Sequence, residues 1–352
     1  MLARMPSVPD TRRPQLQFPR PLKPGDLIGV TSPSSGVDAR MQPRLEVALA
    51  DLRRRGYDVR VGECMSGDRH VSAPKQQRAD ELTAMLLDPE IRAVAPPWGG
   101  ELAIDLLDLV DWDALAAAEP TWLVGYSDMT TVMLPLTLRS GWATLHGANL
   151  MDSPYTPPEG LLHWTDVAAA NGPVVQRSPG RYRTAAHGDY VGNPGVNTFD
   201  LDGEGGWSVL GGGNLEVGGR LIGGCVETLG AISGTPYADV AGFGRDHADD
   251  GLIVYLEACD FGAYDVARIL HGFRLAGWFD EASAILIGRT PAPASGDFTQ
   301  HDAVADALGG LDIPVVLDVD CGHVAPFMPL VNGADTRIVV HNGQGEVSQT
   351  LA

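Results

Sequence analysis

The sequence predicts an α/β fold: an N-terminal, mostly parallel sheet with flanking helices, of the Rossmann or flavodoxin-like type, and a second C-terminal α/β domain. Apolar runs of strand length alternate with segments of helical period, which is typical of parallel sheets covered by helices. Some runs, such as residues 122–124, are continuously apolar, as expected for strands buried on both faces. With 352 residues, the chain is long enough for about two domains.

The first domain is expected to cover residues 22–150. A helical pattern over residues 41–55 is followed by Gly56, a residue type that commonly ends helices. A second helix should end at Asp88, because a proline follows it. The expected elements are a strand and loop (26–36), a helix (41–55), a strand (57–61), a helix (75–87), a strand (91–95), a glycine-containing loop (96–101), a helix after residue 101 and another over 111–118.

Ser127 is expected at a sharp turn between a strand and a helix. The apolar run 122–124 ends at Gly125, and apolar residues at helical spacing follow from Val132. A serine at such a turn projects its hydroxyl outward, and the free N–H groups of the first helical turn can stabilise a developing negative charge. Ser127 is therefore a candidate nucleophile, and the plain alternative is a helix cap.

The pattern weakens over residues 151–213, which are rich in proline, glycine, aspartate and asparagine. We expect a connecting region with substrate-facing loops and one helix near 162–170. The C-terminal domain is expected over residues 214–352. Its expected elements are glycine turns before a helix (218–229), a strand (251–257), a helix (264–276), a strand (284–288), a helix (301–308) and two strands (313–319 and 336–341).

Charge and cysteine content argue against several classes of partner. The 25 basic and 45 acidic side chains give a formal charge of −20, which disfavours nucleic acids and anionic membranes as partners. The four cysteines form no C-x-x-C pair, so a reducing compartment fits and no zinc site is expected. Residues 1–21 lack the apolar core of a signal peptide and are expected to form a loose tail, which favours a cytoplasmic protein.

Two further polar residues lie at strand exits in the C-terminal domain. Glu257 ends one predicted strand, and His323 follows another. Together with Ser127 they match the residue types of a Ser-His-acid triad, in which the histidine takes the serine proton and the acid orients the histidine. His146 is an alternative base and Glu227 an alternative acid, because sequence alone does not show which side chains converge.

Other functions fit the sequence less well. The glycine cluster Gly211-Gly-Gly-Asn214 lacks the βαβ context and the acidic residue of a dinucleotide-binding fingerprint. Cys259 and Cys321 lie close to Glu257 and His323 in sequence, but neither opens a helix, so buried small side chains are the simpler interpretation. A protein that binds a peptide or nucleotide conjugate without cleaving it remains an alternative from another class.

The order of several motifs resembles the LD-carboxypeptidase family of serine peptidases, and within it the branch of microcin C immunity peptidases. The resemblance extends over residues 22–345. It is carried by Leu22-Lys-Pro-Gly-Asp-Leu-Ile-Gly-Val-Thr-Ser-Pro-Ser34, Gly99-Gly100, Gly125-Tyr-Ser-Asp128, Gly219-Arg-Leu-Ile-Gly-Gly224, Tyr255-Leu-Glu257 and Gly322-His323.

This resemblance implies a serine carboxypeptidase without metal or cofactor. Ser127 would be the nucleophile, His323 the general base, and Glu257 the orienting acid. Backbone N–H groups of Gly100 and Asp128 would form the oxyanion hole. The implied substrate is a C-terminal amide in a small peptide or aminoacyl-nucleotide conjugate, with a muropeptide ending in D-alanine as the alternative, and the implied assembly is a homodimer.

The sequence departs from the family pattern near the substrate. Phe261 stands where characterised immunity peptidases have a substrate-binding lysine, and Glu101 replaces an aromatic residue common in muropeptide carboxypeptidases. The aromatic residues could stack on a ring of the substrate, although packing is the common role of such side chains. The substrate-binding candidates are Trp98, Gly99, Glu101, Tyr126 and Trp207.

Overall fold

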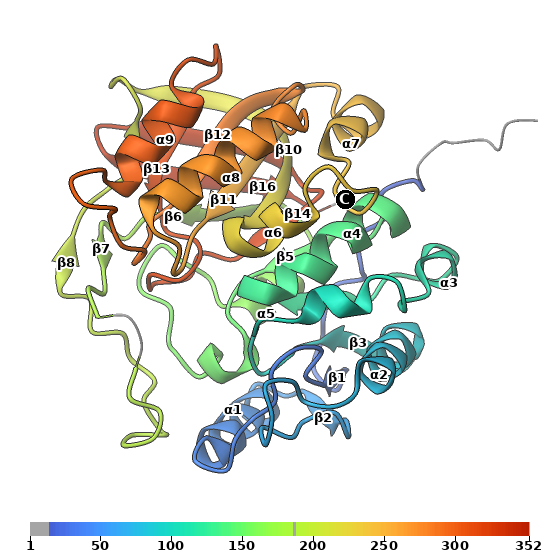
Figure 1. Cartoon of the computed structure of the whole chain (residues 1–352). Helices are drawn as coiled ribbons and strands as arrows, with labels where there is room; N and C mark the ends of the chain where they lie inside the picture. Colours follow the sequence, from blue (N-terminus) through green and yellow to red (C-terminus); the bar gives the residue numbers. More distant parts are fainter. Residues whose placement is uncertain (1–13, 186–187, 352) are drawn as a thin grey trace, which may run out of the picture.

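The computed structural model describes residues 14–185 and 188–351, which fold around two large β-sheets (Figure 1). The N-terminal sheet and its helices, coloured blue to green in Figure 1, form one half of the molecule, and the yellow to red C-terminal elements form the other. Among the described residues, no helix is long and apolar enough to cross a membrane. The predicted α/β fold with two sheet-based units is confirmed.

The N-terminal sheet has six strands in the order β14-β5-β4-β3-β1-β2, and all neighbours are parallel except β14 and β5. Successive residues of β4 join different core clusters: Leu123 belongs to one, and Trp122 and Val124 belong to another. Both faces of the sheet are therefore buried. The strands are β1 (Leu27–Val30), β2 (Asp58–Val61), β3 (Ile91–Val94), β4 (Trp122–Gly125), β5 (Thr144–His146) and β14 (Leu330–Asn332).

Helices of this half match the predicted segments, with two differences. The expected helix after residue 101 is only a short 3₁₀ turn, and another such turn delays the start of α4 until Thr130. The helices are α1 (Gln42–Arg54), α2 (Lys75–Leu87), α3 (Trp112–Ala116), α4 (Thr130–Ser140) and α5 (Trp164–Ala168), and the 3₁₀ turns are η1 (Ala103–Leu106), η2 (Ser127–Met129) and η3 (Leu150–Asp152).

The second sheet has eight strands in the order β6-β16-β15-β10-β11-β12-β13-β9, with β10 to β13 parallel to one another. Its strands are β6 (Val174–Arg177), β9 (Ser208–Val209), β10 (Leu215–Cys225), β11 (Leu252–Glu257), β12 (Ala282–Gly288), β13 (Val315–Val319), β15 (Asp335–His341) and β16 (Gln344–Thr350). Its helices are α6 (Val226–Ile232), α7 (Val240–His247), α8 (Ala263–Leu275) and α9 (Gln300–Leu308), and β7 (Arg181–Tyr182) pairs separately with β8 (Gly203–Glu204).

The prediction of glycine turns over residues 218–224 is wrong, because these glycines belong to the long strand β10. They provide space for neighbouring groups. A Cβ atom at Gly219 would lie 2.7 Å from the Gly251 carbonyl oxygen, and one at Gly224 would lie 2.6 Å from Thr130 Cβ. The glycines therefore let β11 and α4 approach β10 closely.

Some strands belong to a different sheet from the one expected from domain boundaries at residues 150 and 213. β14, from the C-terminal part, joins the N-terminal sheet, and β6 and β9, from the connecting region, join the C-terminal sheet. The expected loose tail falls largely on residues 1–13, outside the described residues. Its described part is docked: the Gln17 N–H donates to the Gly141 carbonyl oxygen at 2.7 Å.

Candidate active site

The sharp turn predicted at Ser127 is present at the carboxyl end of β4. Ser127 has a positive φ of 62°, a conformation that non-glycine residues adopt at a cost of about 1 kcal/mol or more. The residue before it, Tyr126, is extended, and η2 begins at Ser127 itself. This strand-to-turn geometry leaves Ser127 partly exposed and lets it line a pocket, as a nucleophile elbow requires.

The glycine loop after β3 lies directly against this turn. A Cβ atom at Gly99 would lie 2.9 Å from the Asp128 amide nitrogen and 3.0 Å from Ser127 Oγ. Gly100 has a φ of 139°, and a Cβ atom there would collide with the hydroxyls of Ser34 and Ser35. Gly99 is therefore needed for this loop to lie against Ser127 and the Asp128 backbone, and Gly100 is needed for it to lie against Ser34 and Ser35.

The Asp128 side chain holds three loops around Ser127. Its carboxylate accepts hydrogen bonds from the Ser34 hydroxyl at 2.6 Å, the Ala103 N–H at 2.8 Å and the Thr131 hydroxyl at 3.2 Å. The residue is buried. The Asp128 side chain therefore has a supporting role.

His323 and Glu257 form a buried pair at one edge of the second sheet, where Glu257 ends β11 and His323 follows β13. His323 Nδ1 lies 2.6 Å from Glu257 Oε2, and the two residues are 6% and 1% exposed. Gly322 has a φ of 94°, and any side chain there would collide with the Glu257 carboxylate. The Gly322-His323 motif therefore allows the histidine loop to lie against the acid.

The two side chains shift each other's pKa in opposite directions. Burial alone would lower the pKa of His323, but the adjacent Glu257 carboxylate outweighs it and raises this pKa well above its ordinary value. Burial alone would raise the pKa of Glu257, but His323, with a contribution from His146, outweighs it and lowers this pKa. The pair is therefore best described as a carboxylate that stabilises a histidinium.

Ser127 and His323 line the same pocket, of about 370 Å³. Trp98 and Tyr190 stack on one side of it, with ring centroids 6.5 Å apart, and Tyr126 packs edge-on against the His323 ring at 4.9 Å. The Asp152 carboxylate accepts hydrogen bonds from the Tyr126 and Tyr190 hydroxyls. Ser127 and His323 thus open onto one pocket that also has aromatic walls.

A second recess, of about 160 Å³, adjoins Ser127 on another side and is rich in carboxylates. Glu101, Glu227 and Asp260 all line it. Partial burial raises the pKa of Glu101, and the nearby carboxylates raise it further. The exposed aromatic ring of Phe261 also lines this recess.

Glu227 is occupied as a structural anchor. Its Oε1 atom accepts hydrogen bonds from the N–H groups of Cys259, Asp260 and Phe261 at 2.7, 3.0 and 3.2 Å. The described residues place Glu257, rather than Glu227, in hydrogen-bond contact with His323. Of the two acids considered from sequence, Glu257 has the geometry of an orienting carboxylate.

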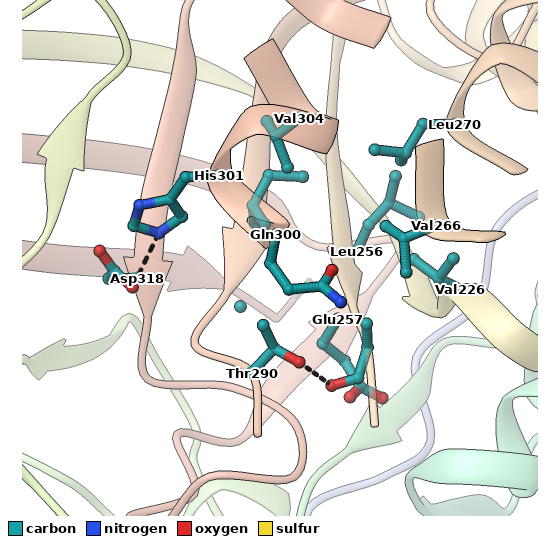
Figure 2. Close-up of a pocket in the computed structure, with 13 residues that line it drawn as sticks. Val226, Leu256, Glu257, Val266, Leu270, Thr290, Gln300, His301, Val304 and Asp318 are labelled. Atoms are coloured by element: carbon teal, nitrogen blue, oxygen red, sulfur yellow. Dashed lines mark hydrogen bonds and ion pairs between the residues drawn. The ribbon is translucent and has the colours of Figure 1, made fainter. Parts of the chain in front are cut away.

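The far side of Glu257 faces a small cavity of about 20 Å³, lined mostly by apolar side chains (Figure 2). Figure 2 shows Val226, Leu256 and Val266 near Glu257, while His301 and Asp318 pair with each other farther away. This apolar backing explains why the charge on Glu257 acts strongly on His323.

Cysteines also lie near this pair. Cys225, Glu257 and His323 offer ligand atoms within 4.8 Å of one another, so they are a possible metal-ligand set, but the hydrogen bond between Glu257 and His323 engages two of its three members. Burial raises the pKa of Cys259, which lines the pocket, and that of buried Cys321. These shifts are opposite to what a nucleophilic thiol requires.

The structure corrects one substrate-binding candidate. Trp207 is only 1% exposed, and its indole N–H donates to Asp320 Oδ2 at 2.9 Å, so it packs beneath the histidine loop instead of lining the pocket. Trp98, Gly99, Glu101 and Tyr126 do line it. Sequence reasoning missed Asn149, Asp152 and Tyr190; the first two follow β5 closely, and that strand exit was their available signal.

Comparison with known proteins places the chain in a family. The model of the LD-carboxypeptidase N-terminal domain matches residues 28–147, and that of the C-terminal domain matches residues 218–338. A Streptomyces coelicolor protein that carries a carboxypeptidase name is 30% identical over 92% of this chain and 95% of its own length. The microcin C7 self-immunity protein MccF of Escherichia coli is 24% identical over 92% of this chain and 93% of its own. The murein tetrapeptide carboxypeptidase of Pseudomonas aeruginosa is 27% identical over 69% of each chain.

Solved structures share the fold. Wild-type MccF in its apo state has a TM-score of 0.78 at 24% identity, covering 96% of this chain and 98% of that chain. A muramoyltetrapeptide carboxypeptidase from Oxalobacter formigenes has a TM-score of 0.69 at 18% identity, covering 92% and 99%. The expected peptidase class is confirmed, and the chain belongs to the LD-carboxypeptidase family of serine peptidases.

Proposed function

We propose that the protein is a serine carboxypeptidase that cleaves a C-terminal amide of a small peptide or aminoacyl-nucleotide conjugate through an acyl-enzyme. The main support is the 2.6 Å contact between His323 and Glu257, together with the pocket that His323 and Ser127 line in common. A non-catalytic binder would not need a strained serine facing an acid-paired histidine.

In the proposed reaction, Ser127 Oγ attacks the amide carbonyl carbon while His323 Nε2 takes the hydroxyl proton. The N–H groups of Gly100 and Asp128 stabilise the resulting oxyanion. His323 then donates its proton to the amine as the C–N bond breaks. Water attacks the acyl-enzyme with His323 again as base, which releases the acid and restores Ser127. Glu257 stabilises the histidinium in both halves.

The first substrate candidate is a conjugate of the microcin C type, with the protein acting in self-immunity. MccF has been crystallised with aspartyl sulfamoyl adenosine. The aromatic walls formed by Trp98, Tyr126 and Tyr190 could accept a flat ring in the pocket next to Ser127.

A muropeptide carboxypeptidase that releases terminal D-alanine is the second candidate, and the acidic recess favours it. Glu101, Glu227 and Asp260 surround this recess, so an acidic substrate side chain would be repelled there, whereas an amino group would be attracted. Relatives that act on murein peptides support the same reading.

The test is a side-by-side assay of the wild type and Ser127→Ala on a muropeptide tetrapeptide and on aspartyl and lysyl sulfamoyl adenosine, with products identified by mass spectrometry. We expect Ser127→Ala to reduce turnover by about 10⁶-fold, as loss of a serine nucleophile does. Turnover retained by Ser127→Ala would refute the nucleophile. Tight binding of a conjugate without cleavage by the wild type would favour the binder.

The assembly and location also belong to this proposal. We propose a cytoplasmic homodimer. Light scattering of the purified protein measures the oligomeric state, and a monomer at assay concentration would contradict the proposed dimer. Fractionation of the source cells measures the location.

A further inference from the structure

His146 is buried beside the proposed triad without a clear hydrogen-bond partner. It ends β5, where its backbone pairs with Gly125, two residues before Ser127. The residue is 1% exposed, and neither ring nitrogen has a hydrogen-bond partner among the described residues. A buried polar group of this kind is costly unless another interaction compensates for it.

A carboxylate oxygen of Glu257 lies close to this ring. His146 Nε2 lies 3.8 Å from Glu257 Oε1, the carboxylate oxygen that does not contact His323 Nδ1 and that is itself buried without a hydrogen-bond partner among the described residues. Edge-on contacts with Tyr126 and Tyr255, at centroid distances of 6.2 and 5.0 Å, hold the His146 ring in this orientation.

The surroundings leave few other sources of compensation for Oε1. The cavity that Glu257 also lines contains the polar side chains of Thr290 and Gln300 (Figure 2), but neither donates a hydrogen bond to Oε1. The two unpartnered groups, one on each sheet, therefore face each other across 3.8 Å.

We propose that His146 is a positioning residue for the triad. His146 Nε2 approaches Glu257 Oε1 while His323 Nδ1 contacts Oε2, so the carboxylate lies between two imidazoles. His146 thereby fixes the Glu257 rotamer and reduces the negative potential that Glu257 exerts on His323. The inference rests on the proposed triad and goes beyond it, because His146 touches neither Ser127 nor the pocket.

Other titratable groups near Glu257 do not contribute to the pH dependence expected from His323. Burial raises the pKa of every neighbouring thiol and phenol above its ordinary value, so these groups are uncharged in the pH range in which a histidine titrates. They are Tyr126, Cys225, Tyr255, Cys259 and Cys321.

The experiment measures the rate of Ser127 acylation by a fluorophosphonate as a function of pH, using intact-protein mass spectrometry. The variants are His146→Leu, which removes the donor, and His146→Gln, whose amide N–H can replace it. His271→Gln is the control. His271 is half-exposed and forms an ion pair with Asp306, and no described hydrogen bond or ion pair joins these two residues to the triad.

For His146→Leu we expect a rate about 10-fold lower, because Glu257 Oε1 loses the polar group that faces it and the Glu257 rotamer is no longer fixed. The acid limb of the profile should also move up by about 0.5 to 1 pH unit, because an unshared Glu257 charge holds the His323 proton more tightly. His146→Gln should restore the limb and most of the rate, and His271→Gln should match the wild type.

A folded His146→Leu protein with an unmoved acid limb would overturn the proposal, since a purely structural role lowers stability without changing the pKa of His323. If leucine prevents folding, His146→Met takes its place. Failure of the proposed function is distinguishable: the wild type would then show neither Ser127 labelling nor turnover, or Ser127→Ala would retain them, whatever the behaviour of the His146 variants.

Discussion

Replacing Glu257 with glutamine tests the central pair of the site. The change removes one negative charge beside His323 and preserves the length of the side chain. Glu257 Oε2 lies 2.6 Å from His323 Nδ1, and glutamine can still accept this hydrogen bond through its carbonyl oxygen. The variant therefore isolates the effect of charge from that of geometry.

The structure determines the direction of both expected effects. In the wild type the carboxylate raises the pKa of His323 well above 6.5, so activity should rise with pH through an acid limb above that value. Without the charge, burial dominates and lowers this pKa, so the limb should move below 6.5. The plateau rate should fall by about 10⁴-fold, or about 5 kcal/mol, as it does when the acid of other Ser-His-acid triads is neutralised.

Glu227→Gln is the matched control for this measurement. Glu227 Oε1 accepts three backbone N–H groups from residues 259–261, and a glutamine oxygen can accept them too, so we expect a loss below about 10-fold. Rates would be measured from about pH 5 to about pH 10 on the substrate identified for the wild type. A larger loss in Glu227→Gln, or an unmoved limb in Glu257→Gln, would refute the assignment of the acid.

Two further predictions concern the glycine loop and stability. Gly100→Ala should lower kcat by about 10²-fold or more with less effect on KM, because the φ of Gly100 is 139° and the new methyl group would collide with Ser34. Steady-state kinetics measures kcat and KM, and a thermal melt shows whether the variant folds. An unchanged kcat would argue against a role of Gly100 in the oxyanion hole. The His323–Glu257 pair should stabilise the fold most between about pH 4.5 and about pH 6.5. The raised pKa of His323 contributes stability fully below its unfolded value near 6.5, and this is lost as pH rises through the folded value; the lowered pKa of Glu257 contributes fully above about 4.5 and is lost as pH falls. The difference in Tm between wild type and His323→Gln should peak in that window, and a difference independent of pH would contradict the coupling.

Periodic segments of the fold could be predicted from sequence, whereas strands without an apolar pattern could not. The helix expected over 75–87 is found as α2 (Lys75–Leu87). β10 was mistaken for turns because glycine normally indicates them, and here its role depends on neighbours that approach from distant parts of the chain. β16 was missed because its sequence is largely polar, and β14 has only three residues.

The residue types of the site could be predicted from their position at strand exits, but their contacts could not. The sequence leaves His146 open as an alternative base and Glu227 as an alternative acid, because distances between side chains of two sheets depend on how the sheets pack. The structure pairs His323 with Glu257 and gives Glu227 three backbone donors. Trp207 was misjudged because a tryptophan in a loop-rich segment gives no sign of the buried carboxylate that it contacts.

The packing of the sheets has a specific chemical link near the proposed nucleophile. The Thr130 hydroxyl donates to the Ser127 carbonyl oxygen at 2.8 Å and accepts from the Cys225 N–H at 3.2 Å. Cys225 in turn is the β10 neighbour of Glu257 in the parallel pairing with β11. One buried hydroxyl thus joins the Ser127 turn to the strand beside the acid, and Gly224 allows α4 to come close enough for this contact. The glycines of β10 therefore matter for the proposed chemistry as well as for the fold, because they let the Ser127 turn approach the sheet that carries Glu257.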